Sequence, residues 1–108
     1  MKSQEEHGMQ RVTVLYPNAA DTKFDFDYYL AKHVPWVAGL VGQKIEVRRG
    51  IASVSGSRAA FICVATIFIE SAEQFKAVFA EHGAKILADI PNYTNSQPFV
   101  QIDEVLQG

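Results

Sequence analysis

The chain of 108 residues contains a single cysteine, Cys63, and therefore cannot form a disulfide bond within itself. It also lacks an excess of charge of either sign. Its 10 lysine and arginine residues stand against 12 aspartate and glutamate residues, for a net charge of -2. Proteins that bind nucleic acids or anionic membranes usually carry a basic surface. We therefore expect neither a nucleic acid nor a membrane as a partner.

Long apolar runs are missing as well. The longest, residues 59–69, falls short of the roughly 20 residues that a helix needs to cross a bilayer. Residues 1–9 contain no apolar stretch of the kind that a signal peptide requires. Cys63 stands in an apolar run, which is typical of a buried thiol in a reducing compartment. Together these features predict a cytoplasmic protein.

The composition fits a soluble globular domain, with 48% hydrophobic and 20% charged residues. The length allows one domain with its own core, so we predict an extension over 1–9 and a single domain over 10–108. Within this domain, β-branched and alternating patterns predict strands, and helical spacing predicts two helices, the second bent near Gly83. The predicted strands are 10–16, 44–51, 59–69 and 98–106, and the predicted helices are 25–41 and 71–90.

The order βαββαβ is typical of the α+β class, and specifically of a ferredoxin-like antiparallel sheet with both helices on one face. The third strand is apolar on both faces, since Ile62 and Val64 alternate with Cys63 and Ala65. Two helices can cover only one face, and soluble monomers rarely expose a large apolar patch. We therefore predict a homodimer in which the two sheet faces meet.

The first helix has clear signals at its start and near its middle. Asp25 can cap its N-terminus, with Phe24 and Tyr29 as a hydrophobic staple across the first turn. Pro35 lacks an N–H and its ring would strike the carbonyl of residue 31, so we expect a helix break after His33. A second helical piece can then begin at Pro35. His33 would stand at the break, with Tyr29 one turn behind it on the same face.

From about Arg11 onward, the chain resembles the EthD-like family of dimeric α/β-barrel proteins. The resemblance rests on FDFDYY at 24–29 with KHVP at 32–35, IESAEQF at 69–75, and ADIPNYT at 88–94 with QP at 97–98. It implies a dimer of ferredoxin-like subunits, each with a pocket between sheet and helices. Related barrel families include cofactor-independent monooxygenases, lactone isomerases and haem enzymes. Many relatives carry proline and tyrosine ahead of the third strand, where this chain has SRAA at 57–60.

His33 and Tyr29 are the candidate catalytic residues. An imidazole can exchange protons near neutral pH, and a tyrosine hydroxyl can hold a substrate oxygen. Each also has a structural interpretation. His33 at a helix end is favoured by the helix dipole, and Tyr29 can be a core residue with a solvated hydroxyl.

Five further residues are candidates for substrate binding. Asn92, Tyr93 and Thr94 follow Pro91 in a polar loop, which can close over a pocket or simply form a turn. Trp36 fits either substrate binding or a role as a packing or interface residue. Arg49 is placed inside by alternation, where it could neutralise a carboxylate ligand or pair with an acidic residue of the last strand, Asp103 or Glu104.

No metal site and no cofactor are expected, because the three histidines are far apart in sequence and no glycine-rich phosphate loop is present. The leading hypothesis is a homodimer that binds a hydrophobic or aromatic small molecule, and turns it over as a cofactor-independent oxygenase, isomerase or dehydratase. The alternative is a binding or accessory protein without catalysis. A haem-binding barrel would need an axial histidine, His33 or His82.

Overall fold

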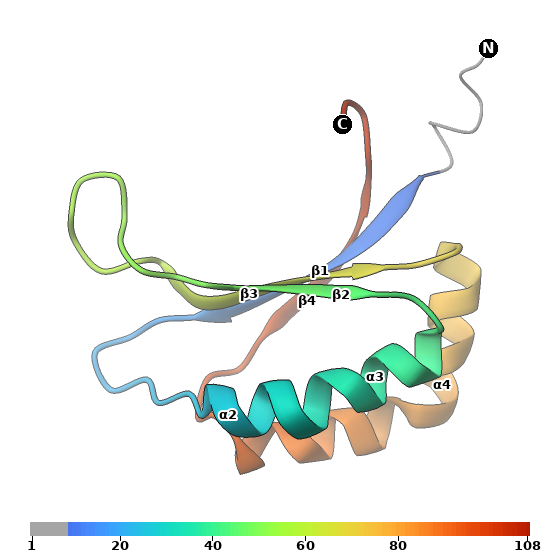
Figure 1. The fold of residues 1–108 in the computed structure, drawn as a ribbon, viewed down its shortest axis with the longest axis horizontal. Helices are drawn as coiled ribbons and strands as arrows, with labels where there is room; N and C mark the ends of the chain where they lie inside the picture. The colour runs from blue at the N-terminus through green and yellow to red at the C-terminus, as the bar shows by residue number, and fades with distance from the viewer. Residues whose placement is uncertain (1–8) are drawn as a thin grey trace.

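The structure is a computed structural model that describes residues 9–108. Its centre is a four-stranded sheet in the order β2-β3-β1-β4, in which every neighbouring pair is antiparallel (Figure 1). The strands are β1 (Gln10–Pro17), β2 (Ile45–Arg49), β3 (Phe61–Phe68) and β4 (Phe99–Glu104). Each lies within about two residues of the span predicted from sequence, and β2 stops two residues early at Arg49.

All helices lie on the same side of this sheet, below it in Figure 1. They are α2 (Phe26–Tyr28), the π-helical turn Tyr29–His33, α3 (Val34–Val41), α4 (Ala72–Asp89) and a short 3-10 turn, Ile90–Asn92. The order βαββαβ and the antiparallel sheet are therefore confirmed. No helix in residues 9–108 is both long enough and apolar enough to span a membrane. Of the extension predicted over 1–9, only Met9 falls within the described residues.

The start of the first helix follows the sequence signals. The Asp25 side chain accepts a hydrogen bond of 3.1 Å from the N–H of Tyr28, as an N-cap does. The rings of Phe24 and Tyr29 lie 5.0 Å apart and pack edge to face, which forms the expected staple. The helix ends at Gly42, whose φ of 72° is the left-handed conformation of a glycine C-cap.

The helix break expected after His33 is wrong. The chain runs from α2 through the π-helical turn into α3 without interruption. In that turn, the N–H of Val34 donates to the carbonyl of Tyr29, five residues back. The wider turn places Pro35 in the first turn of α3, where a missing N–H costs no hydrogen bond. The proline is thus accommodated by a local widening of the helix.

α4 begins where Ser71 accepts a hydrogen bond of 3.0 Å from the N–H of Gln74, as the capping pattern predicts. It forms one continuous helix to Asp89, and its ribbon bends between its first and last turns (Figure 1). Gly83 is buried on this helix because the ring of Phe79 lies where a Cβ would stand. The bend brings the last turns of α4 beside the segment that carries His33.

The sheet and helices enclose two adjoining groups of buried side chains. The first surrounds Val12, Val37, Val41, Ile67, Ile69 and Phe75. The second surrounds Tyr16, Tyr29, Cys63, Ile90 and Tyr93, and is rich in hydroxyl groups. Cys63 is fully buried, and burial raises the pKa of its thiol to about 11, so it stays protonated and unreactive at neutral pH.

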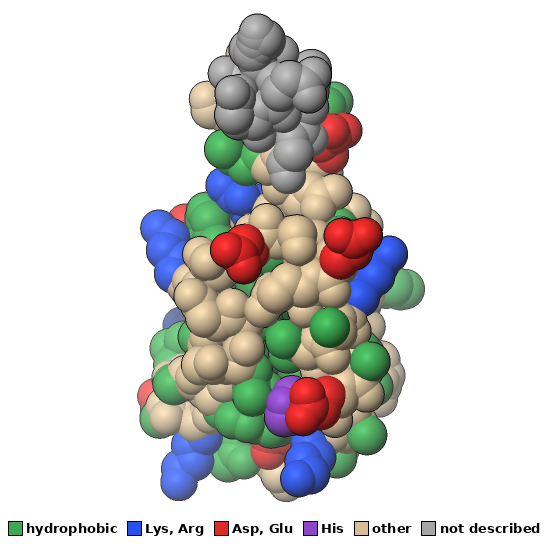
Figure 2. Space-filling model, turned by 90° about the vertical axis from the view of Figure 1, so that its right-hand side faces the viewer, with side chains coloured by type: hydrophobic (Ala, Val, Ile, Leu, Met, Phe, Trp, Pro, Cys, Tyr) green, Lys and Arg blue, Asp and Glu red, His purple; other side chains and the backbone are tan. Residues whose placement is uncertain are grey.

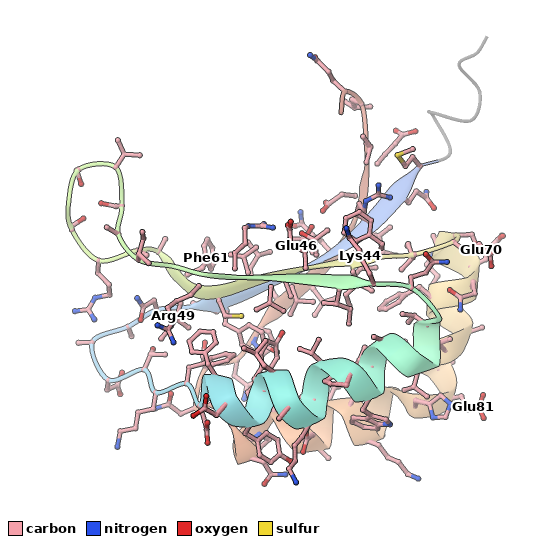
Figure 3. All side chains as sticks on the ribbon, viewed as in Figure 1. Lys44, Glu46, Arg49, Phe61, Glu70 and Glu81 are labelled. Atoms are coloured by element: carbon pink, nitrogen blue, oxygen red, sulfur yellow. The ribbon has the colours of Figure 1, made fainter. Side chains whose placement is uncertain are left out.

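No helix in residues 9–108 covers the other face of the sheet. Leu15 pairs with Val64 on one side and with Phe99 on the other, so these three form an apolar row across it. Thr13, Thr66 and Gln101 form the next row on one side of it, and Lys44 and Glu46 project from the same face (Figure 3). The uncovered face therefore carries both apolar and polar side chains (Figure 3).

Candidate functional site

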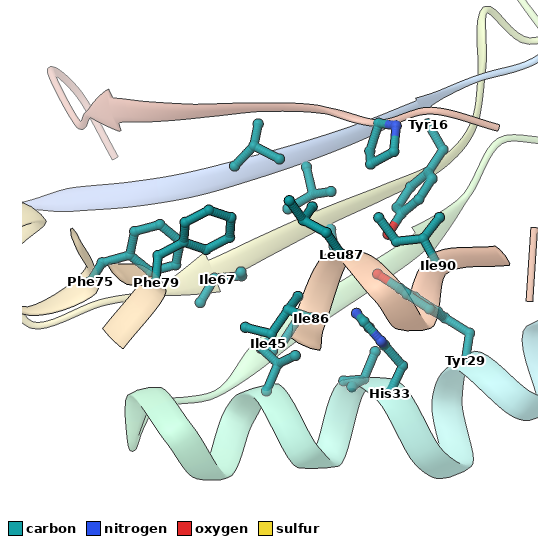
Figure 4. A pocket seen from close by; sticks show the side chains of 16 residues that line it. Tyr16, Tyr29, His33, Ile45, Ile67, Phe75, Phe79, Ile86, Leu87 and Ile90 are labelled. Carbon is teal, nitrogen blue, oxygen red and sulfur yellow. The ribbon is translucent and has the colours of Figure 1, made fainter. Parts of the chain in front are cut away.

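A cavity of about 60 Å³ lies between the sheet and the helices, at the junction of the two buried groups. Its walls are apolar, and they include Val37, Ile45, Ile67, Phe75, Phe79 and Ile86 (Figure 4). Polar side chains, Tyr16, Tyr29 and His33, stand at one end. Among residues 9–108, no aspartate, glutamate, lysine or arginine lines it.

The cavity comes nearest to the surface where its exposed lining residues stand, on α4 and on the edge strand β4. Leu87 and Val100 line the cavity there, and they are 48% and 45% exposed. The volume accommodates about four to six water molecules at roughly 10–15 Å³ each. A larger ligand therefore requires these two side chains to move, and their exposure leaves them room to do so.

His33 reaches the polar end of the cavity from the π-helical turn. It is only 6% exposed, and its ring stacks on Tyr29 with centroids 5.6 Å apart and planes 16° apart. Trp36 packs against it from the outer side in a T-shaped arrangement, with ring centroids 6.0 Å apart. Packing on both sides fixes the ring's orientation.

Asp89 holds one nitrogen of this ring. The Nδ1 atom of His33 lies 2.9 Å from Oδ2 of Asp89. A carboxylate only accepts hydrogen bonds, so Nδ1 carries a proton, and in the neutral form of the ring the lone pair is on Nε2. Asp89 also accepts from the Tyr28 hydroxyl at 2.7 Å and the Asn92 amide at 2.9 Å. Burial alone would raise the pKa of Asp89, but the hydrogen bonds from Asn92, His33 and Tyr28 outweigh it and lower the pKa.

A chain of hydroxyl groups continues from the other nitrogen. The Tyr93 hydroxyl lies 3.4 Å from Nε2 of His33, a long hydrogen bond, and 2.7 Å from the Tyr16 hydroxyl. The hydroxyls of Tyr16 and Tyr29 point toward each other (Figure 4). Burial raises the pKa of Tyr16 to about 12, and it also raises the pKa of Tyr29 and of Tyr93. All three tyrosines therefore remain neutral hydrogen-bond donors at physiological pH.

The structure brings some of the predicted site residues together. Tyr29 and His33 line the cavity, and the Tyr93 hydroxyl contacts His33 directly. Asn92 acts behind them, through its hydrogen bond to Asp89. Thr94 lies farther away, because its hydroxyl donates to the carbonyl of Lys23 and ties the loop to the start of the first helix.

The other two candidates do not line the cavity. Trp36 lies on its outer side, in an open groove between the helices that it shares with Tyr28, Lys32, Lys85, Asp89 and Asn92. Arg49 is exposed at the rim of the sheet, and its guanidinium lies 4.5 Å from the centre of the Phe26 ring (Figure 3). The suggested pairing of Arg49 with Asp103 or Glu104 is wrong, because β2 and β4 are opposite edges of the sheet.

Two residues that sequence reasoning missed are central to the site. Asp89 is an acidic residue at the C-terminal end of a helix, where the helix dipole disfavours negative charge. That unfavourable position was a signal that the carboxylate has specific partners. Tyr16 stands on the inner face of a central strand, and a buried tyrosine hydroxyl needs a hydrogen-bond partner.

Comparison with known proteins agrees with the fold. An EthD-like protein from Ralstonia eutropha JMP134 has a crystal structure with a TM-score of 0.86, at 40% identity over 94% of this chain and 95% of that one. An ethyl tert-butyl ether D (EthD) family protein from Bacillus halodurans C-125 matches with a TM-score of 0.65 and 18% identity. It covers 91% of this chain and 99% of that one, and it supports the fold alone.

Sequence comparison gives the family. An uncharacterized 11.0 kDa protein of the thcB-thcC intergenic region of Rhodococcus erythropolis is 30% identical over 88 residues, which are 81% of this chain and 85% of that protein. Residues 18–97 match the EthD domain. This range contains His33, Asp89 and Tyr93, and excludes Tyr16. The chain belongs to the EthD domain family.

Proposed function

We propose that this protein binds a small uncharged molecule in the cavity beside His33, and that His33 moves a proton on that molecule. The observation that carries the proposal is the contact between Nδ1 of His33 and Asp89, with the opposite side of the ring turned to an apolar cavity. An aspartate that fixes the Nδ1–H form leaves Nε2 as a base once the ligand displaces the long 3.4 Å hydrogen bond from the Tyr93 hydroxyl.

The lining of the cavity favours an uncharged ligand. A buried charge without a counter-charge costs several kcal/mol, and the cavity lining described for residues 9–108 contains no lysine, arginine, aspartate or glutamate. The hydroxyls of Tyr16 and Tyr29 can donate to an oxygen at one end of the ligand. The apolar walls fit a ligand whose remaining atoms form a hydrocarbon chain or an aromatic ring. A small ketone or phenol has this arrangement of groups.

The chemical step that fits is removal of a proton from a carbon beside a carbonyl group. Nε2 takes the proton and the ring becomes an imidazolium, which the Asp89 carboxylate stabilises. The electron pair of the broken C–H bond moves to the carbonyl oxygen, where neutral tyrosines donate hydrogen bonds. Return of the proton to another atom would complete an isomerisation.

Deuterium exchange tests this step without knowledge of the natural substrate. Small neutral ketones are incubated with the protein in D₂O, and loss of the hydrogen beside the carbonyl is followed by NMR. We expect His33→Gln to slow enzyme-dependent exchange by about 10²–10⁴-fold while ligand binding persists. The matched control is His82→Gln, because His82 lies on α4 beside Glu81 and does not line the cavity. Equal exchange rates in His33→Gln and wild type would contradict the proposal.

A binding protein without catalysis is the second candidate. Both ring nitrogens of His33 have partners within residues 9–108, so the site is also complete as a closed hydrogen-bond network. In this case ketones bind, His33→Gln weakens that binding, and neither protein catalyses exchange.

We also propose that two copies pair through the uncovered sheet face. The face carries an apolar row formed by Leu15, Val64 and Phe99. Phe99 is 65% exposed, and a second copy would bury this apolar surface. Sedimentation at micromolar concentration should give a particle of twice 12.0 kDa. Val64→Glu should shift it toward the monomer, whereas Ala84→Glu, on the exposed side of α4, should not. A 12.0 kDa wild-type particle would contradict pairing.

A further inference from the structure

The helix that carries His33 is widened at the turn where this histidine stands. An α-helix bonds each N–H to the carbonyl four residues back, but the N–H of Val34 bonds to Tyr29, five residues back. Ordinary α-helix precedes this turn in α2 and follows it in α3. We propose that Pro35 sets this wide turn and is thereby a positioning residue for His33. The inference rests on the proposed function in one respect, that His33 is the group that meets the ligand.

Proline at position 35 is incompatible with an unbroken α-helix. It has no N–H to donate to Ala31, and its ring would collide with the Ala31 carbonyl. Widening the helix just before the proline places it in the first turn of α3, where an N–H has no partner to lose. The helix can then continue, and the extra residue is taken up between Tyr29 and His33.

The wide turn also determines which way the helix faces. The buried residues Tyr29, His33, Val37 and Val41 are each four positions apart. Four residues of α-helix rotate about 40° beyond a full turn, so three such steps would drift by about 120°. A turn that holds more residues rotates less per residue and removes part of this drift. Tyr29, His33 and Val37 therefore all line the cavity, while Val41 remains in the core.

Both ends of the helix are fixed by contacts outside the turn. Asp25 caps the N-terminus, and the Tyr28 hydroxyl is bonded to Asp89. At the other end, Gly42 closes the helix and the Gln74 amide donates to the carbonyl of Val41. A change in the turn is therefore taken up by rotation of the segment between these ends, which contains His33.

The test is Pro35→Ala, which restores an N–H and removes the ring. We expect the turn to narrow and the contact between His33 and Asp89 to be lost. Nitrogen-15 NMR of the imidazole reports this directly, because the two neutral tautomers have different spectra. In wild type the Nδ1–H form should dominate, and in Pro35→Ala the ratio of Nε2–H to Nδ1–H should rise at least about tenfold. The measurement uses ligand-free protein, so it does not depend on whether His33 catalyses a reaction.

Gly39→Ala is the matched control, because it raises the helix propensity of α3 and its added Cβ meets nothing within 4 Å. It should leave the tautomer ratio unchanged. If Pro35→Ala alone folds poorly, the pair Pro35→Ala with Gly39→Ala supplies the same spectrum on a better helix former. If Pro35→Ala lowers the Tm but leaves the tautomer ratio unchanged, Pro35 stabilises the helix without orienting His33. That result would overturn the proposal.

Discussion

The Nδ1 atom of His33 lies 2.9 Å from Oδ2 of Asp89, and this contact ties the first helical segment to the end of α4. Asp89 occupies a position that a helix disfavours for an anion. Donors from three other segments compensate, because His33, Tyr28 and Asn92 all bond to its carboxylate. The same contact orients the imidazole and stabilises the fold.

Acid should remove the contribution of Asp89 to stability. Its pKa is lower in the folded protein than the ordinary value of 3.8, because the hydrogen bonds outweigh the effect of burial. The contribution is therefore complete above the unfolded value and is lost as pH falls through the folded one. We expect the difference in free energy of unfolding between wild type and Asp89→Asn to shrink below about pH 4. Urea denaturation over a pH series measures it, and a difference that is as large at pH 2 as at about pH 5 would contradict the assignment.

The hydroxyls of Tyr16 and Tyr93 should act as a unit. They lie 2.7 Å apart among buried rings, so removal of either leaves the other without that partner. Tyr16→Phe and Tyr93→Phe should each lower the free energy of unfolding by about 1–3 kcal/mol, and the double variant should lose less than the sum. A double-mutant cycle in urea measures the coupling. Strict additivity would show that the two hydroxyls are independent.

The order of elements could be predicted from the sequence because its signals are local. The capping residues Asp25 and Ser71, together with strand alternation, depend on neighbours within a few positions. The π-helical turn could not be predicted in this way. Pro35 indicates that an ordinary helix fails, but the choice between a break and a widened turn depends on what Tyr29, His33 and Val37 bury against the sheet.

The part of the candidate site that lies on the first helix could be predicted from the sequence. The hydrogen-bond network that joins it to other elements could not. Tyr29 and His33 are neighbours on one helix face, so their spacing alone brings them together. Asp89 and Tyr16 join them only through tertiary contacts, Asp89 by the bend of α4 and Tyr16 by its place on β1. Arg49 shows the converse error. Alternation placed it correctly on the helix side of the sheet, but β2 ends there, so its side chain is exposed at the rim over Phe26 and is not buried (Figure 3).

Asp25 and Asp27 offer a matched pair at the start of the first helix. Only Asp25 has a cap hydrogen bond, to the N–H of Tyr28, while Asp27 is exposed in the first turn. Asp25→Ala should lower the free energy of unfolding by about 1 kcal/mol, and Asp27→Ala by only a few tenths. Thermal denaturation of the two variants under one set of conditions compares them. Equal losses would mean that charge near the helix start matters and the cap does not.

Among the glycines of residues 9–108, Gly50 is the one whose substitution should destabilise the fold most. A Cβ there would overlap the carbonyl oxygen of Phe61, and the N–H of Gly50 donates to the carbonyl of Ile62 at 2.9 Å. Backbone cannot yield as a flexible side chain does, so Gly50→Ala should cost at least about 3 kcal/mol of unfolding free energy. Gly39→Ala, with open space around it, should instead gain about 0.5–1 kcal/mol.

The clash at Gly50 should also reach the cavity. It lies where the chain leaves β2, and β2 carries Ile45, which lines the cavity. Separation of β2 from β3 would move that wall, so Gly50→Ala should weaken ketone binding in ligand-observed NMR, and Gly39→Ala should not. A Gly50→Ala protein with the same urea midpoint as wild type and the same affinity for ketones would contradict this prediction. It would show that β2 and β3 can separate at this end without loss of stability, and that the cavity wall does not depend on their close approach.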